Sequence, residues 1–268
     1  MGPQTTLKTL AVLALSLLSP TASASRSFEN RGTLDGWHGQ SIDSGTRGSV
    51  QQVTNVFLKG PTALKASQTY LGTSYKGRYH AEVYRRDGYR PGETRYYGFA
   101  FRLSEDWEFT DQNYNIAQFI ADFSDLGKPE CDTWMPSTMV WVRGNKLRTR
   151  ARWGDLSGNK CDKQTDSWDV ATIERGRWHR VVLGVSWRTD GKGFVKVWLD
   201  GEQKLDKQSI STTVVDPANR QFSFRVGLYA NGWHDDKGVM KGSQPFRQVW
   251  YDEIAIGSSE GEVQPGSW

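Results

Sequence analysis

Histidine and cysteine are scarce in this chain, with four and two of them among 268 residues. Two cysteines alone do not supply an ordinary zinc site, so structural zinc is not expected. No Asn-x-Ser/Thr sequence occurs, and N-glycosylation is therefore not expected. Apart from residues 10–18 the chain has no long apolar run, and convincing helical periodicity is missing. These absences point away from a helical or membrane-spanning protein.

The single long apolar run belongs to a predicted secretory signal peptide. Within residues 1–24, Lys8 is the only charged side chain and Ala22-Ser-Ala24 is a small-residue cleavage pattern. The apolar run is too short to span a membrane. Residues 25–268 are therefore predicted to form one secreted, extracellular domain, without a membrane anchor and monomeric.

The two cysteines are predicted to pair with each other in the oxidising environment outside the cell. A disulfide between Cys131 and Cys161 would contribute about 3–4 kcal/mol in the chain-entropy model. A catalytic thiol is the less favoured interpretation.

Short strand-like runs, bounded by Gly, Asp and Asn, recur along the whole chain. Asp200-Gly201 follows one of them and predicts a hairpin turn. Many short antiparallel strands at this length predict an all-β fold, a two-sheet jelly-roll sandwich with a concave substrate groove. The expected strands are 63–67, 79–86, 96–103, 116–123, 139–143, 146–153, 179–187, 194–199, 222–229 and 249–256.

Residues 222–233 form the most informative of these stretches. With period two, apolar side chains fall on one face, whereas Arg225, Tyr229 and Asn231 fall on the other. Gly227, on that second face, would leave room for a ligand to approach the backbone. This strand is predicted to form the floor of a site.

Three further strands have polar faces. His80, Glu82, Tyr84 and Arg86 share a face in one, and Gln118 shares a face with Tyr114, Ile116, Ile120 and Asp122 in another. A third strand places four cations on one face: Lys146, Arg148, Arg150 and Arg152. A row of cations fits either a solvated edge strand or a groove for an acidic polymer. The 33 aromatic residues favour a polysaccharide over a nucleic acid, because sugar rings bind to flat apolar surfaces.

Distances along a strand limit which of these residues can act together. Residues four apart on one strand are roughly 13 Å apart, so a catalytic cluster should take one residue from each neighbouring strand. His80, Gln118 and Tyr229 meet that condition. The flanking substrate-binding residues would then be Tyr84, Arg86, Arg148, Arg150, Arg152, Arg225 and Asn231.

Three segments resemble the site strands of jelly-roll polysaccharide lyases of the alginate-lyase and heparin-lyase-I type: Tyr79-His-Ala-Glu-Val-Tyr-Arg-Arg86, Asn115-Ile-Ala-Gln-Phe119 and Gly227-Leu-Tyr-Ala-Asn231. The chain as a whole most resembles fungal glucuronan lyases, from Phe28-Glu-Asn30 to Tyr251-Asp-Glu-Ile-Ala-Ile256. The alginate enzymes have a Gln-x-His segment. Here Ile120 follows two residues after Gln118, which argues against alginate as the substrate.

The resemblance implies β-elimination across a 4-linked uronic acid, most favourably β-1,4-glucuronan. Gln118, with His80, would donate hydrogen bonds to the uronate carboxylate so that charge can develop on it. Tyr229 would take the C5 proton, or protonate the leaving oxygen, or do both. The sequence leaves open which of Tyr229 and His80 is base and which is acid. It also leaves open whether cleavage is internal.

Two other functions fit an extracellular sandwich. A glycoside hydrolase needs two carboxylates roughly 5–10 Å apart across one bond, and no polar strand face offers acidic residues at i and i+2 or i+4. A non-catalytic carbohydrate-binding module would need the aromatic residues and cations but not the combination of Gln, Tyr and His.

A structural, non-catalytic calcium ion is also expected. First and last strands often meet in such sandwiches, which would bring Glu29 and Asp252 together, and two carboxylates repel unless a cation lies between them. The alternative is that each carboxylate pairs separately with Arg or Lys. The resemblance favours calcium, because related lyases commonly hold one in this region.

Overall fold

A computed structural model describes residues 1–2, 26–128, 130–158 and 161–268. The predicted signal peptide, apart from its first two residues, lies outside these ranges. The described residues contain sixteen strands, which form two sheets of eight. Within the described residues, no helix has the length and apolar character needed to cross a membrane.

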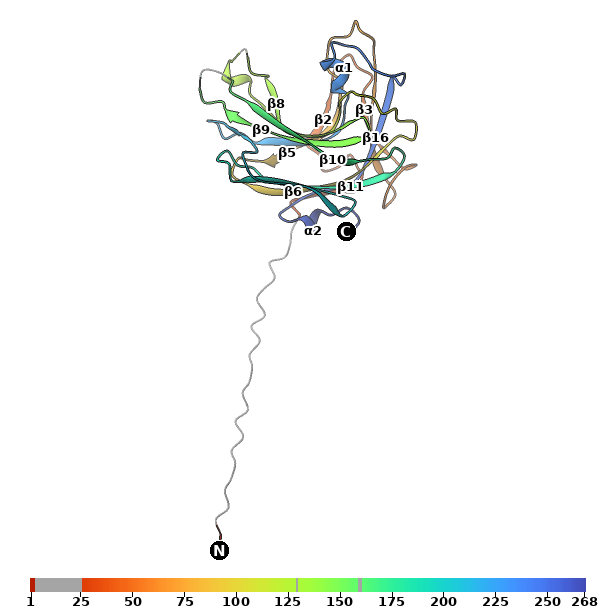
Figure 1. Cartoon of the computed structure of the whole chain (residues 1–268). Coiled ribbons are helices and arrows are strands. Elements are labelled where there is room, and N and C mark those ends of the chain that lie inside the picture. Colours follow the sequence, from red (N-terminus) through yellow and green to blue (C-terminus); the bar gives the residue numbers. More distant parts are fainter. Residues whose placement is uncertain (3–25, 129, 159–160) are drawn as a thin grey trace.

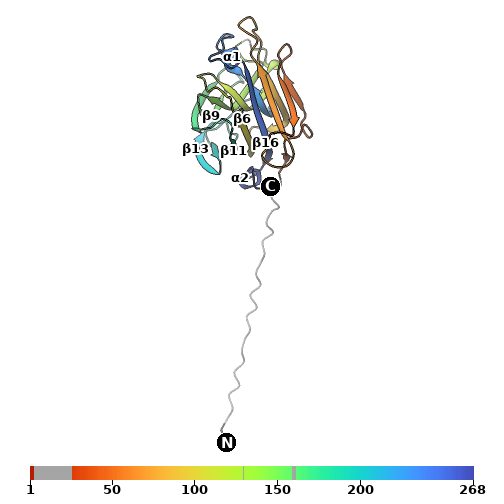
Figure 2. The same ribbon diagram turned by 90° about the vertical axis from the view of Figure 1, so that its right-hand side faces the viewer.

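The first sheet comprises β1 (Phe28–Asn30), β3 (Ser49–Val53), β4 (Ala63–Thr69), β6 (Thr94–Leu103), β11 (Trp178–Ser186), β12 (Gly193–Leu199), β13 (Glu202–Ile210) and β16 (Phe246–Gly257). Their order is β13-β12-β11-β6-β16-β4-β3, and β1 pairs with β16. All these pairings are antiparallel. Figure 2 shows β16, in dark blue, beside the orange strands from the start of the chain.

The second sheet comprises β2 (Gly39–Ile42), β5 (His80–Tyr89), β7 (Tyr114–Asp122), β8 (Trp134–Arg143), β9 (Lys146–Asp155), β10 (Gln164–Thr172), β14 (Val214–Val215) and β15 (Phe222–Tyr229). Their order is β10-β9-β8-β7-β15-β5-β2, and β14 adds to β9 in parallel. This sheet curls upward above the flatter first sheet (Figure 1). In the part of the chain that the structure describes, three short helices complete the fold, namely η1 (Ser124–Leu126), α1 (Asn231–Asp235) and α2 (Glu260–Val263).

The predicted two-sheet jelly roll is confirmed, and every expected strand overlaps an observed one. The alternation along β15 holds, since Phe222, Phe224, Val226 and Leu228 are buried in the core shared by both sheets. The hairpin turn is also confirmed. Asp200 and Gly201 have φ of 54° and 87°, which is the left-handed backbone that a two-residue turn with right-handed strand twist requires.

One predicted strand face is partly wrong. Tyr114 and Ile116 were expected beside Gln118, but both belong to the core, and Tyr114 packs against Trp107 with ring centroids 5.2 Å apart. The pairing of β7 with β8 shifts register between Asn115 and Ala117. An extra residue in one strand shifts the alternation of side chains between the two faces of the sheet from that point on. The face that Gln118 occupies therefore does not continue to Tyr114 and Ile116 at the start of β7.

The two ends of the described fold lie together on the outer side of the first sheet. The Arg26 guanidinium donates to the Glu262 carbonyl at 3.0 Å and lies 4.8 Å from the Trp268 ring centroid. Helix α2 packs against β6 and β16. Figure 1 shows α2 and the C-terminus below the sandwich, on the side away from the curled sheet.

Candidate active site

A groove follows the inner surface of the curled sheet as a series of adjoining pockets. Tyr84 and Arg86 line one end, and Arg225 belongs to both that end and the next section. Arg78 joins this section to the pocket that contains Tyr229. Arg150 and Asn231 continue from there to a last section, lined by Asn113, Met139, Trp141, Arg143, Arg148 and Ser167. The predicted polar faces thus form one groove with a strongly cationic lining.

Tyr229 and His80 meet at the centre of this groove. They are register partners on β15 and β5, and their rings stack with centroids 3.8 Å apart. Arg78, in the loop before β5, donates a hydrogen bond from Nη1 to the Tyr229 hydroxyl at 2.6 Å. Tyr229 and His80, which can both transfer protons, therefore lie in contact, and the Tyr229 oxygen accepts a hydrogen bond from the positively charged Arg78.

The environment of the Tyr229 hydroxyl pulls its pKa in two directions. Burial is the larger effect and raises the pKa above the ordinary value of a phenol. The Arg78 charge and hydrogen bond act against this, while nearby Asp235 raises the pKa further. The net effect raises the pKa of Tyr229 and favours the phenol, and Arg78 is the group that opposes this shift.

Asp43 holds the imidazole of His80. One Asp43 oxygen lies 3.0 Å from His80 Nδ1 and also accepts the His80 backbone N–H at 2.7 Å. Burial raises the Asp43 pKa, but the His80 contacts outweigh it and lower the pKa below its ordinary value. An ionised Asp43 favours a proton on Nδ1, which leaves Nε2 as the ring nitrogen that can exchange a proton with a substrate.

The amide of Gln118, which was predicted to face the substrate, donates its hydrogen bonds to a protein side chain instead. Its amide nitrogen donates to both carboxylate oxygens of Glu82 at 2.8 Å, and its own oxygen has no partner. Both residues are fully buried. Arg225 Nη1 lies 3.5 Å from the same Glu82 carboxylate. The amide donors expected to face the substrate are therefore engaged beneath the groove surface.

The cationic face of β9 is present, but β9 is not an edge strand. Leu147, Thr149 and Ala151 are buried, and the cations lie on the opposite face. β9 lies between β8 and β10, so the alternative of a solvated edge strand is wrong. β10 forms that edge instead.

The β9 cations differ in how far protein partners already neutralise them. Arg148 Nε lies 2.5 Å from Asp169, and Arg152 Nη1 lies 4.0 Å from Asp132. Arg150 donates to the Pro136 carbonyl at 3.1 Å, and burial lowers its pKa to about 9. Burial destabilises the charged form of the Arg150 guanidinium, so an anion that enters the groove would stabilise Arg150 more than the already paired Arg148 and Arg152.

Gly227 has a different role from the one predicted. A Cβ at this position would lie 2.3 Å from the Ala81 carbonyl oxygen and 2.5 Å from the Glu82 Cα. Its φ of 148° is also rare for other residues. The group that approaches this glycine is strand β5 rather than a ligand.

The two carboxylates predicted to share calcium have separate partners. Glu29 is half exposed and lies 2.8 Å from the Arg26 guanidinium. Asp252 is buried and accepts hydrogen bonds from the backbone N–H groups of Leu58, Lys59 and Glu253 at 2.8–2.9 Å. Across the described ranges, no group of three or more His, Cys, Asp or Glu side chains is arranged to hold a metal. Glu29 and Asp252 as placed do not fit a shared ion.

Among the groove residues that sequence reasoning missed are Arg78, Asp43 and Trp134. Arg78 and Asp43 lie in loops and meet the site only through long-range contacts, so strand periodicity carries no signal for them. Arg78 stands two residues before His80, and this spacing was the one available indication. Trp134 begins β8, in a segment that Pro136 makes unpromising as a strand.

Comparison with known proteins identifies the family. The sequence profile described as polysaccharide lyase matches residues 29–255. The chain belongs to the polysaccharide lyases. It is therefore an enzyme, and the alternatives of a glycoside hydrolase and a carbohydrate-binding module are set aside.

Solved structures agree with the assignment of this chain to the polysaccharide lyases. The endo-beta-1,4-glucuronan lyase from the fungus Trichoderma reesei is similar over 91% of this chain and 100% of its own, with 47% identity and a TM-score of 0.86. The cellulose induced protein Cip1 shares the fold at 16% identity and a TM-score of 0.52, over 83% of this chain and 91% of its own. No curated protein sequence gave a match.

Proposed function

We propose that this lyase cleaves β-1,4-glucuronan by β-elimination, with Tyr229 as the main proton-transfer residue. The observation that carries the proposal is the Tyr229 hydroxyl, which accepts a 2.6 Å hydrogen bond from Arg78 inside a cationic groove. The 47% identity to a glucuronan lyase supports the substrate.

The stereochemistry of glucuronan suits a single residue for both proton transfers. In a β-1,4-linked D-glucuronate the C5 proton and the C4 oxygen lie on the same face of the ring. A phenolate at Tyr229 takes the C5 proton, the C4–O4 bond breaks as the C4–C5 double bond forms, and the new phenol protonates O4. The positive charge of Arg78 favours the phenolate that begins this cycle.

The uronate carboxylate must be neutralised while charge develops on it. Arg78 and Arg150 line the same pocket as Tyr229 and provide that positive field. Gln118 would donate only if substrate binding draws its amide away from Glu82. His80, held through Nδ1 by Asp43, offers Nε2 either as a donor to the carboxylate or as a second proton carrier.

The test is the ultraviolet absorbance of the unsaturated uronate product on glucuronan, alginate, heparin and pectate. The proposal expects the fastest rise with glucuronan. Release of reducing ends without the absorbance change would contradict elimination. A faster rise with another of the four polymers would replace the substrate but not the chemistry.

Three further properties of the chain belong to the same proposal. The enzyme is secreted, acts as a monomer and holds a structural calcium ion. Because Glu29 and Asp252 do not share an ion, the calcium would lie at Glu253, the residue after Asp252. Both carboxylate oxygens of Glu253 are buried without hydrogen-bond partners. Lys59 Nζ, 3.8 Å from Glu253 Oε1, is the cation that calcium would replace. Size-exclusion chromatography and assay of culture medium test the first two properties.

A further inference from the structure

Trp134 places a half-exposed indole in the groove, between the section lined by Arg225 and the pocket that contains Tyr229. It is the first residue of β8 and is 50% exposed, while the following Met135 is buried in the core. Alternation along the strand therefore directs the Trp134 ring to the groove side. Trp134 lines the two groove sections that share Arg225 and also the pocket that contains Tyr229.

Arg225 lies against this ring. Its guanidinium carbon is 5.3 Å from the Trp134 ring centroid and 5.7 Å from that of Tyr84. Arg225 is 8% exposed, its Nη1 donates to Ser41 at 3.1 Å, and its Nε is buried without a partner. The cation is held in one orientation, with the buried Glu82 carboxylate 3.5 Å from Nη1, and it meets the groove in the two sections that it lines.

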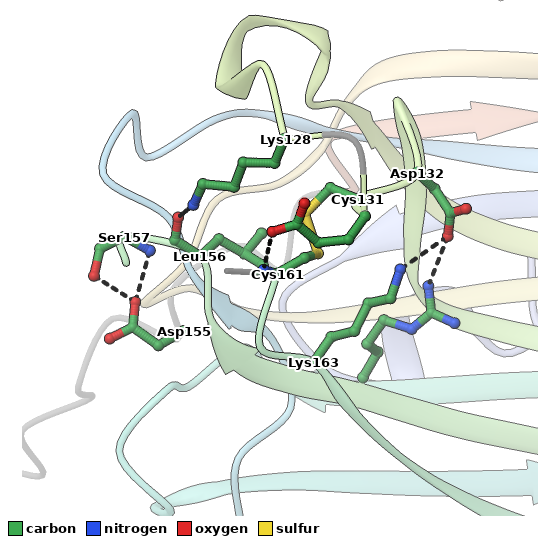
Figure 3. Close-up of a disulfide and its surroundings, with 10 residues drawn as sticks. Lys128, Cys131, Asp132, Asp155, Leu156, Ser157, Cys161 and Lys163 are labelled. Carbon is green, nitrogen blue, oxygen red and sulfur yellow. Dashed lines mark hydrogen bonds and ion pairs between the residues drawn. A yellow bond between two sulfur atoms is a disulfide. The ribbon is translucent and has the colours of Figure 1, made fainter. Parts of the chain in front are cut away.

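The segment that carries Trp134 is fixed by a covalent cross-link. Cys131, three residues before Trp134, forms the predicted disulfide with Cys161. Asp132 lies 3.1 Å from Lys163 Nζ and 4.0 Å from Arg152 (Figure 3). The disulfide and these ion pairs thus restrain the backbone next to the indole.

We infer that Trp134 and Arg225 form a distal uronate subsite, which binds a sugar other than the one that loses its C5 proton. Arg225 and Tyr229 are four residues apart on β15, roughly 13 Å, which is longer than one pyranose ring. The C–H face of a pyranose packs on the indole, and the carboxylate of the same or the next sugar pairs with Arg225. This inference rests on the proposed function for the identity of the sugar.

A distal subsite predicts that the effect of Trp134 depends on substrate length. Trp134→Ala, Trp134→Phe and wild type are compared on polymeric glucuronan and on a series of glucuronate oligomers. With the polymer, kcat/KM should fall at least tenfold for Trp134→Ala and less for Trp134→Phe. With the shortest oligomers that wild type cleaves, the loss should be several-fold smaller, because such substrates occupy the pocket of Tyr229 without extending to the section that Trp134 shares with Arg225.

Phe57→Ala is the matched control, since Phe57 is 44% exposed and does not line the groove. It should behave as wild type with every substrate. Binding is measured separately by calorimetry in a Tyr229→Phe background, where long oligomers stay intact. In this background, Trp134→Ala should raise the Kd of long oligomers at least tenfold. Carboxyl-reduced oligomers should bind weakly to both proteins, because they lack the group that pairs with Arg225.

Equal losses for Trp134→Ala at every oligomer length, with an unchanged melting temperature, would show that Trp134 acts at the central site or through the fold. No loss at any length would also overturn the subsite. Failure of the proposed function is distinguishable, because wild type itself would then give no absorbance change with glucuronan.

Discussion

The Tyr229 hydroxyl and the Arg78 guanidinium lie 2.6 Å apart, although 151 residues separate them in the chain. A guanidinium has only donors, so the phenol oxygen accepts this bond and keeps its own proton free for another acceptor. The same bond would be strengthened on ionisation, because it would then join two opposite charges. One contact therefore serves both protonation states of the proposed catalytic residue.

Tyr229→Phe removes the hydroxyl and keeps the ring that stacks on His80. Activity should fall at least about 10²-fold, the lower range for loss of a general acid or base. Initial rates from product absorbance on glucuronan measure the loss, and the melting temperature should stay close to that of wild type. Near-native turnover of the folded variant would falsify the assignment of Tyr229.

Arg78→Gln should move the pH dependence of kcat/KM to higher pH. Burial already raises the Tyr229 pKa, and Arg78 is the group that opposes this effect. Without the cation the phenolate forms only at higher pH, so the acid limb of the profile shifts upward. Arg78→Lys retains the charge and should shift the limb less. If kcat/KM falls at every pH while the acid limb stays at the same pH, Arg78 acts in substrate binding alone.

Glu82→Gln should destabilise the protein by about 3 kcal/mol, because it removes the countercharge of the buried Arg225. The variant also alters the carboxylate that holds Gln118. Denaturant unfolding measures the change, with Glu29→Gln as a control at a half-exposed ion pair. Equal stability of the two variants would show that Glu82 and Arg225 gain little from each other.

Substitutions in the β9 cations should affect substrate affinity unequally. Arg148 already has Asp169 at 2.5 Å, whereas the described contacts of Arg150 include only a backbone carbonyl acceptor. Arg150→Gln should raise KM roughly tenfold, or about 1.4 kcal/mol, and Arg148→Gln less. Replacing both with Glu should flatten the salt dependence of KM, because fewer screened contacts remain. Unchanged binding at low salt would make these residues part of a solvated surface only.

Calcium removal should lower the melting temperature without abolishing activity in the cold. An ion that binds only the native state stabilises it by mass action, and the proposed elimination uses no metal. Melting curves are compared with EDTA, with EDTA plus excess calcium, and with magnesium. Identical curves would argue against the ion. Loss of turnover in the still-folded protein would make it catalytic instead.

Strand alternation predicted the centre of the site well, because neighbouring strands place their inward side chains in one row. Tyr229 and His80 were expected to meet, and they stack in register across β15 and β5. The prediction did not include site residues that lie in loops. Asp43 and Arg78 touch these two side chains through connections that no local pattern encodes.

The four longer strands that the sequence did not reveal are β2, β3, β10 and β13, and they form the edges of the two sheets. An edge strand faces water along one side and needs few apolar residues. β10 and β13 are mostly exposed and lack a clear apolar alternation. Their position follows from the neighbours that they pair with rather than from their own composition.

The pairing of Arg26 with the C-terminal segment has a practical consequence. Both ends of the described fold lie on the outer side of the first sheet, away from the curled sheet (Figure 1). The residues that line the groove belong to that curled sheet and its loops. A tether to a solid support or a fusion partner attached at Trp268 would hold the groove outward. A long polymer could then thread past the immobilised enzyme, so that it could be reused on insoluble or gelled uronans.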